Sequence, residues 1–156
     1  MISDDVFAFL TGGKSLVIGT CDAALVPECA RAVALRCAPD RRHVSVFLPE
    51  VVCARTVANL RDNGSIAIGI SHPPDHRSLQ LKGVLKKLAP AMPDDLPFVQ
   101  RYLHELSQSL DLVGMPANIV ERLNYLPCLC AEVEVEAIFL QTPGPDAGRA
   151  LTGAMP

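Results

Sequence analysis

The feature that most constrains the fold is a succession of short apolar segments separated by turn residues. Ser15–Cys21 is almost wholly apolar, as expected of a strand buried on both faces, and Ser65–Ser71 is a further expected strand. His43–Leu48 alternates apolar and polar residues, which is typical of a strand with one buried face. Because the connections are short, consecutive strands favour a closed antiparallel barrel, and the alternative is an α+β sheet with helices on one side. The other expected strands are Pro27–Cys37, Ser78–Leu88 and Leu129–Thr142.

Helical patterns separate some of these strands. Cys53, Val57 and Leu60 recur at helical spacing, and Asn63-Gly64 is a typical helix end. Ser3 is a plausible N-cap for a short helix. We therefore expect one domain over residues 1–142 and a Pro- and Gly-rich tail over 143–156. The expected helices besides the central one are Asp4–Leu10, one from Phe98 to about Leu112, and Ala117–Leu123.

The composition is that of a globular protein. Of the 156 residues, 49% are hydrophobic and 20% charged, and the net charge of −3 gives no basic field for nucleic acid. No apolar run approaches the roughly 18 residues that span a bilayer. The start of the chain is acidic and lacks the pattern of a signal peptide. We expect a cytoplasmic protein without a nucleic-acid or membrane partner.

The six cysteines and the excess of apolar residues have simple interpretations. In a cytoplasmic protein the cysteines are expected to be free thiols, several of them buried. The apolar content exceeds what one small core needs, which favours a homodimer with a two-fold interface.

Two arginines suggest an anion site. Arg55 falls in the first turn of the expected central helix, where the partial positive charge of the helix start is unfavourable to it. A phosphate there would resolve the conflict, with the Thr56 hydroxyl as a further donor. Arg31 lies in a strand among small residues that leave room for a flat ligand. In a small barrel these two arginines could grip one phosphate; the alternatives are a solvent-facing Arg55 and an edge-strand Arg31.

The order of these elements resembles the pyridoxamine 5'-phosphate oxidase-like FMN-binding split barrels. The similarity covers roughly residues 15–88. It includes the strand Arg31-Ala-Val-Ala-Leu35, the helix with a basic start, and the strand Arg77-Ser-Leu-Gln-Leu-Lys-Gly83. The resemblance implies a mainly β fold, a six-stranded antiparallel split barrel with Greek-key-like connections and flanking helices. It also implies a homodimer with FMN as the cofactor.

The resemblance also implies the site residues. Arg31 would contact the phosphate, and the next four residues would lie against the flavin. The basic pair at the helix start of the family falls on Arg55 and Thr56, so only one basic residue is kept. Glu50 falls near a position where the family often has a hydroxyl, and its carboxylate would repel phosphate. Ser78 and Gln80 would reach the flavin from the second subunit. The flavin-facing strand residues are Ala32, Val33, Ala34 and Leu35.

The function expected from this resemblance is an FMN-dependent oxidoreductase. The C-terminal Trp and Arg-rich segment of true pyridoxamine phosphate oxidases is missing, which argues against pyridoxal phosphate synthesis. Two alternatives remain open. One is a non-catalytic barrel that binds haem or another flat cofactor, with His72 or His76 as a ligand. The other is a barrel that has lost its cofactor and acts as an interaction protein.

Three further constellations carry less weight. His72, Asp75 and His76 could hold a metal, but Pro73-Pro74 breaks the helical register, and no metal is expected. The set of Ser107, His104 and Asp111 lies on one amphipathic helix without a Gly-rich elbow. Gly12–Ser15 mimics the end of a phosphate loop without its preceding strand and first glycine.

Overall fold

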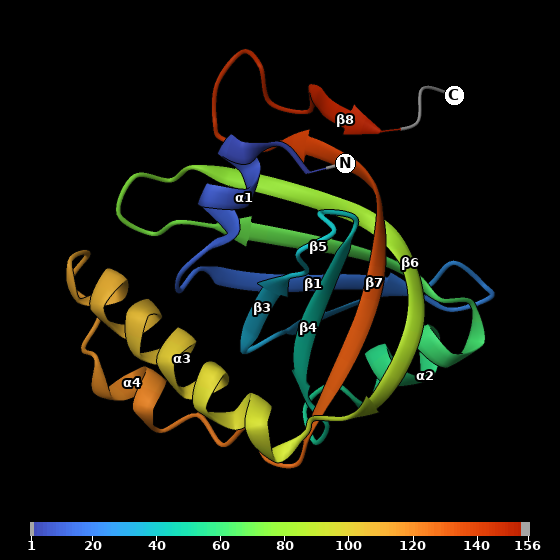
Figure 1. The fold of residues 1–156 in the computed structure, drawn as a ribbon, viewed down its shortest axis with the longest axis horizontal. Coiled ribbons are helices and arrows are strands. Elements are labelled where there is room, and N and C mark those ends of the chain that lie inside the picture. Colours follow the sequence, from blue (N-terminus) through green and yellow to red (C-terminus); the bar gives the residue numbers. More distant parts are fainter. Residues whose placement is uncertain (1, 154–156) are drawn as a thin grey trace.

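A computed structural model describes residues 2–153 as one curled antiparallel sheet flanked by helices (Figure 1). Hydrogen-bonded neighbours follow the order β2-β1-β5-β6-β7-β4-β3, and β8 pairs with β7. The expected mainly β architecture is therefore confirmed, with eight strands in place of six. The strands are β1 (Ser15–Cys21), β2 (Pro27–Arg31), β3 (Ala34–Cys37), β4 (His43–Pro49), β5 (Ser65–Ser71), β6 (Ser78–Pro90), β7 (Cys128–Leu140) and β8 (Ala150–Gly153).

One continuous segment supplies both edges of the sheet. The single strand expected over Pro27–Cys37 is wrong, because this segment forms two strands on different neighbours. β2 pairs with β1, whereas β3 pairs with β4 at the other end of the strand order. Between them the Val33 amide donates to the carbonyl of Phe47 at 2.9 Å. At Ala32–Val33 the chain leaves its pairing with β1 and begins to pair with β4, because the curled sheet brings its two edges to the same place.

The helices cover the openings of the curled sheet. In Figure 1, α3 and α4 lie along one end and α2 lies at the other. The Ser3 hydroxyl accepts a hydrogen bond from the Val6 amide at 3.4 Å, so its role as N-cap is confirmed. α3 begins two residues earlier than expected, and α4 is shorter. The helices are α1 (Asp4–Leu10), α2 (Ala54–Asp62), the 3₁₀ turn η1 (Pro93–Asp95), α3 (Leu96–Asp111) and α4 (Asn118–Glu121).

A close backbone contact fixes α3 against the barrel. The Gly13 amide donates to Oε2 of Glu105 at 2.9 Å. A Cβ atom at Gly13 would lie 2.6 Å from the carbonyl oxygen of Tyr102, so only glycine permits this approach. α3 therefore sits on the loop that leads into β1.

The expected tail is partly ordered. Residues 143–149 form turns, as their Pro and Gly content predicts, but β8 then pairs with β7. Residues 154–156 of the expected tail lie outside the described residues. All six cysteines are free, with Cys53 and Cys128 buried. Within residues 2–153, no helix combines the length and the apolarity that crossing a bilayer requires.

Candidate functional site

The two candidate arginines are separated by the alternation of β2. Side chains of a strand point alternately to its two faces, so Glu28 and Arg31 lie on opposite faces. Glu28 contacts Arg55 of α2, whereas Arg31 contacts Ser15 of β1. The two guanidinium groups therefore lie on different faces of β2. The structure does not bring them together on a single phosphate.

Glu28 supplies the negative charge expected beside Arg55. Its Oε2 lies 3.3 Å from Nη1 of Arg55, and the side chains are 23% and 66% exposed, respectively. Burial, reinforced by the charge of Glu28, raises the pKa of Cys53 at the start of α2. Because Arg55 is in the first turn of α2, this contact places the Glu28 carboxylate close to the helix start. Because such an exposed pair contributes at most about 1 kcal/mol, a stronger anion can replace Glu28.

The start of α2 retains unused hydrogen-bonding capacity. Its N-cap, Cys53, makes no side-chain cap; its thiol donates to the Arg31 carbonyl at 3.6 Å. Thr56 is fully buried, and within the described structure its Oγ1 has no hydrogen-bond partner. Glu50 is exposed in the turn before α2, where its amide donates to the Pro127 carbonyl. These groups fit an anion in part, with Glu28 and Glu50 opposing it.

Arg31 has a different environment. Its Nη1 donates to the Ser15 hydroxyl at 3.2 Å, and among the side chains that the structure describes no carboxylate lies at ion-pair distance from it. The side chain lines a cavity of about 680 Å³ between the end of the barrel and the α3–α4 pair. We call this the helix-covered cavity. Its volume is in the range of small-molecule sites.

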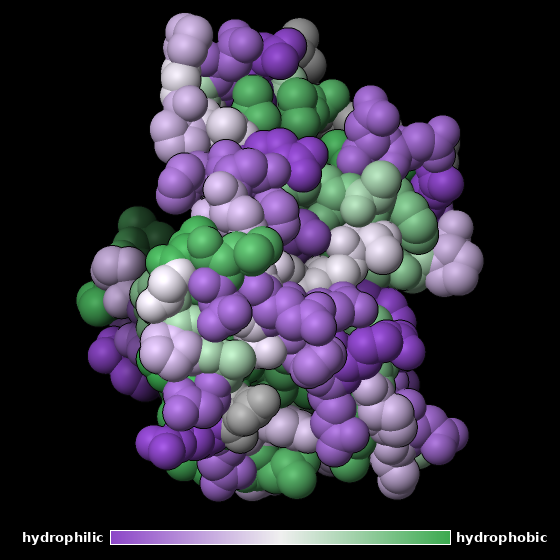
Figure 2. All heavy atoms as spheres, turned by 90° about the vertical axis from the view of Figure 1, so that its left-hand side faces the viewer, coloured by the Kyte–Doolittle hydropathy of each residue, from purple (hydrophilic) through white to green (hydrophobic). Residues whose placement is uncertain are grey.

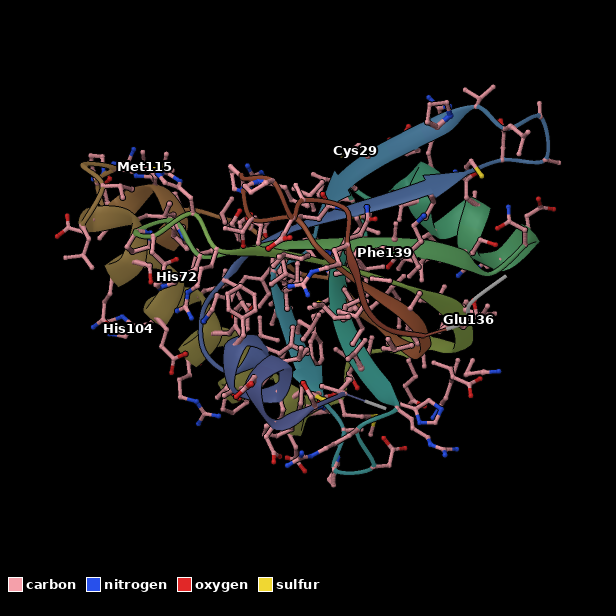
Figure 3. All side chains as sticks on the ribbon, turned by 90° about the horizontal axis from the view of Figure 1, so that it is seen from above. Cys29, His72, His104, Met115, Glu136 and Phe139 are labelled. Atoms are coloured by element: carbon pink, nitrogen blue, oxygen red, sulfur yellow. The ribbon has the colours of Figure 1, made fainter. Side chains whose placement is uncertain are left out.

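The helix-covered cavity has two unlike walls. Strand ends and the β5–β6 loop give the polar wall, which includes His72, His76 and Ser78 besides Arg31. Figure 3 shows His72 at the same end of the molecule as Met115 of the α3–α4 connection. Figure 2 faces this end, where apolar patches reach the surface between polar ones. The apolar wall includes Leu106, Leu110, Val113, Met115, Ile119 and Val120.

His72 lies against a carboxylate of its own loop. Its Nδ1 lies 2.8 Å from Oδ1 of Asp75, and Nε of Arg77 lies 2.7 Å from Oδ2 of the same carboxylate. Desolvation raises the pKa of Asp75, but its contacts with His72 and Arg77 outweigh this effect, and the net change is downward. The contact of His72 Nδ1 with Asp75 falls outside hydrogen-bond geometry in the described structure, so it places a carboxylate beside the imidazole without fixing the ring.

The remaining predicted residues are divided between these regions. Ser78 lines the helix-covered cavity, and its hydroxyl donates to the His76 carbonyl at 3.0 Å. Gln80 is partly buried and pairs with Gly69 and Phe139. The strand residues expected against a flavin are buried: Ala32, Val33, Ala34 and Leu35. The apolar wall had no signal in the local sequence beyond helical periodicity, because its position depends on the distant contact of Gly13 with α3.

Comparison with known proteins identifies the fold through structure alone. No family model and no curated protein match the sequence. HupZ of Group A Streptococcus superimposes with a TM-score of 0.58 at 17% identity, covering 95% of this chain and all of HupZ. A candidate pyridoxamine 5'-phosphate oxidase from Lactobacillus delbrueckii gives 0.55 at 9% identity, covering 88% of this chain and 92% of its own. The haem storage protein HutZ of Vibrio cholerae gives 0.51 at 14% identity, covering 89% and 94%.

These similarities agree with the strand order and with the closure of the sheet by β2 and β3. At such low identities they define architecture, not activity. The chain has the split-barrel fold of the pyridoxamine 5'-phosphate oxidase-like proteins.

Proposed function

We propose that this protein binds FMN as a homodimeric flavoprotein, with the phosphate at the start of α2. The observation that carries the proposal is the fully buried Thr56 hydroxyl without a partner, beside a helix start without a side-chain cap. A phosphate would accept from this helix end and from the Arg55 guanidinium. The resemblance of the sequence and the split-barrel fold support FMN as the group that carries it.

FMN supplies hydride and electron transfer when bound. The residues of this chain would anchor and orient it. Arg55 would exchange its contact with Glu28 for the phosphate, and residues 32–35 would face the ring. Arg55 is 66% exposed, so a second copy of the chain would complete the pocket by covering it. Light scattering should then give about twice 16.7 kDa.

The test is flavin fluorescence quenching with FMN and with riboflavin, which lacks the phosphate. A charge-assisted phosphate contact contributes about 1.5–3 kcal/mol, so Arg55→Ala should weaken FMN about 10- to 100-fold and leave riboflavin nearly unchanged. Arg31→Ala is the matched control on the other face of β2 and should change FMN affinity less than about twofold. Equal affinity for FMN and riboflavin, with no response to Arg55→Ala, would sink the proposal.

Haem binding is the second candidate, favoured by one observation. His72 lines the helix-covered cavity with Nδ1 2.8 Å from Oδ1 of Asp75, and a carboxylate beside one ring nitrogen favours ligation through the other. HutZ, which shares the fold, is a haem storage protein. Titration with hemin should then give a sharp Soret band that His72→Ala removes and His104→Ala keeps. A Soret band that is the same in all three proteins would reject His72 as the ligand, and the lack of a Soret band in the wild type would reject haem binding.

A further inference from the structure

We propose that the helix-covered cavity binds a monocarboxylic acid with an apolar body, such as a medium-chain fatty acid, and that Arg31 receives its carboxylate. The inference goes beyond the proposed FMN function. Arg55 and Arg31 lie on opposite faces of β2, so each can be tested without the other.

The charges around the cavity favour an anion. Arg31 is the only Lys, Arg, Asp or Glu among the described residues that line it. His72 and His76 can only add positive charge there. Asp75, which lies beside His72 of the polar wall, is already engaged by His72 and Arg77. A guanidinium that has only the Ser15 hydroxyl as its partner among the described side chains therefore faces a space whose described lining holds no carboxylate.

The opposite wall favours an apolar body. It is built by α3, α4 and their connection, and several of its side chains remain accessible: Val113 and Ile119 are each 49% exposed and Met115 is 42% exposed. Apolar surface of this kind gains free energy when a ligand covers it. The cavity thus presents a cation on one side and an uncovered apolar surface on the other, which is the complement of an amphiphile.

One cation matches one negative charge. A guanidinium fork pairs with a carboxylate through two parallel hydrogen bonds. A doubly charged phosphate would find only one permanent cation, since the described lining holds no second Arg or Lys. The volume of about 680 Å³ accommodates an acyl chain of medium length.

The experiment is isothermal titration calorimetry of the full chain with decanoate and with decanol, which has the same chain and no charge. Decanoate should bind, and Arg31→Gln should weaken it roughly 10- to 100-fold. Arg55→Gln, the matched control, should change it less than about twofold. Affinity should rise with chain length by up to roughly fourfold per CH₂. Val113→Glu should weaken decanoate, because it places a like charge on the apolar wall at a position exposed enough to tolerate it.

Circular dichroism confirms that each variant is folded before titration. Decanol should bind at least roughly tenfold more weakly than decanoate and should not respond to Arg31→Gln. Equal binding of the two ligands would overturn the proposal. So would equal losses in Arg31→Gln and Arg55→Gln, or no binding of decanoate at millimolar concentration. Displacement of decanoate by hemin in a manner that requires His72 would assign the cavity to haem and overturn it as well.

Discussion

The two faces of β2 place chemically identical side chains in opposite electrostatic situations. On the face toward α2, Arg55 lies 3.3 Å from Glu28, beside a helix start that lacks a side-chain cap. On the other face, Arg31 has a hydroxyl partner and lines a cavity without carboxylates among its described residues. The partner of each arginine, more than its place in a sequence motif, therefore determines whether it can bind an external anion. Arg55 can bind an external anion only in exchange for Glu28, whereas Arg31 has no carboxylate partner among the described side chains.

The largest expected effect is on stability. It comes from the close contact between Gly13 and α3, the helix that forms part of the apolar wall on the Arg31 side. Gly13→Ala forces a Cβ atom against the backbone of α3, and we expect the free energy of unfolding to fall by about 3 kcal/mol or more. Gly19→Ala is the control, because its Cβ would meet Ala67 at an ordinary 3.8 Å. Urea denaturation compares the two variants. Equal stabilities would mean that α3 does not rest on the Gly13 loop as described.

Two buried threonines near α2 differ in whether their hydroxyl has a hydrogen-bond partner, and this difference can be tested. The Thr20 hydroxyl accepts from Nδ2 of Asn59 at 3.1 Å, so Thr20→Val leaves a buried donor unpaired and should cost about 1–3 kcal/mol of stability. Thr56→Val removes a hydroxyl that has no partner in the described structure, and stability should hold or rise by up to about 1 kcal/mol.

The same Thr56→Val variant should weaken FMN if the hydroxyl serves the phosphate. Denaturation and flavin fluorescence quenching give the two readings. A large loss of stability in Thr56→Val, with FMN affinity unchanged, would mean that the hydroxyl has a structural partner and no role in binding.

The smallest expected effect concerns the carboxylates that oppose a phosphate. Glu28→Gln removes the direct partner of Arg55 and should tighten FMN by roughly three- to fivefold. Glu50→Thr should also tighten FMN, but less, since Glu50 is exposed and makes no ion pair among the described residues. Fluorescence titration orders the two variants. Weaker binding in Glu28→Gln would show that Glu28 assists the cofactor instead of excluding it.

Local patterns predicted most elements because their causes are local. The alternation of Ser78, Gln80 and Lys82 with buried Leu79 and Leu81 is a property of one strand, and the structure shows it. Helical spacing and Asn63-Gly64 likewise located α2, which ends at Asp62. The predicted β architecture followed from these repeats.

The features that sequence reasoning missed depend on distant contacts. The break at Ala32–Val33 exists because the sheet curls until its two edge strands, β2 and β3, can follow one another in the chain. No residue of this segment by itself indicates the break. The apolar wall of the cavity depends on a hydrogen bond between Gly13 and Glu105, 92 positions apart. The contact of Arg55 with Glu28 joins α2 to a strand 27 positions earlier in the chain. Sequence spacing alone therefore could not show whether Arg31 and Arg55 reach the same phosphate.

The central claim is that β2 divides two anion sites, and one crossed measurement tests it most directly. FMN and decanoate are each titrated into the wild type, Arg31→Gln and Arg55→Gln under the same conditions. We predict that Arg55→Gln weakens FMN roughly 10- to 100-fold and leaves decanoate within about twofold, and that Arg31→Gln does the reverse. If substitution of one and the same arginine weakened both FMN and decanoate, the two sites would not be separate, and this result would contradict the account.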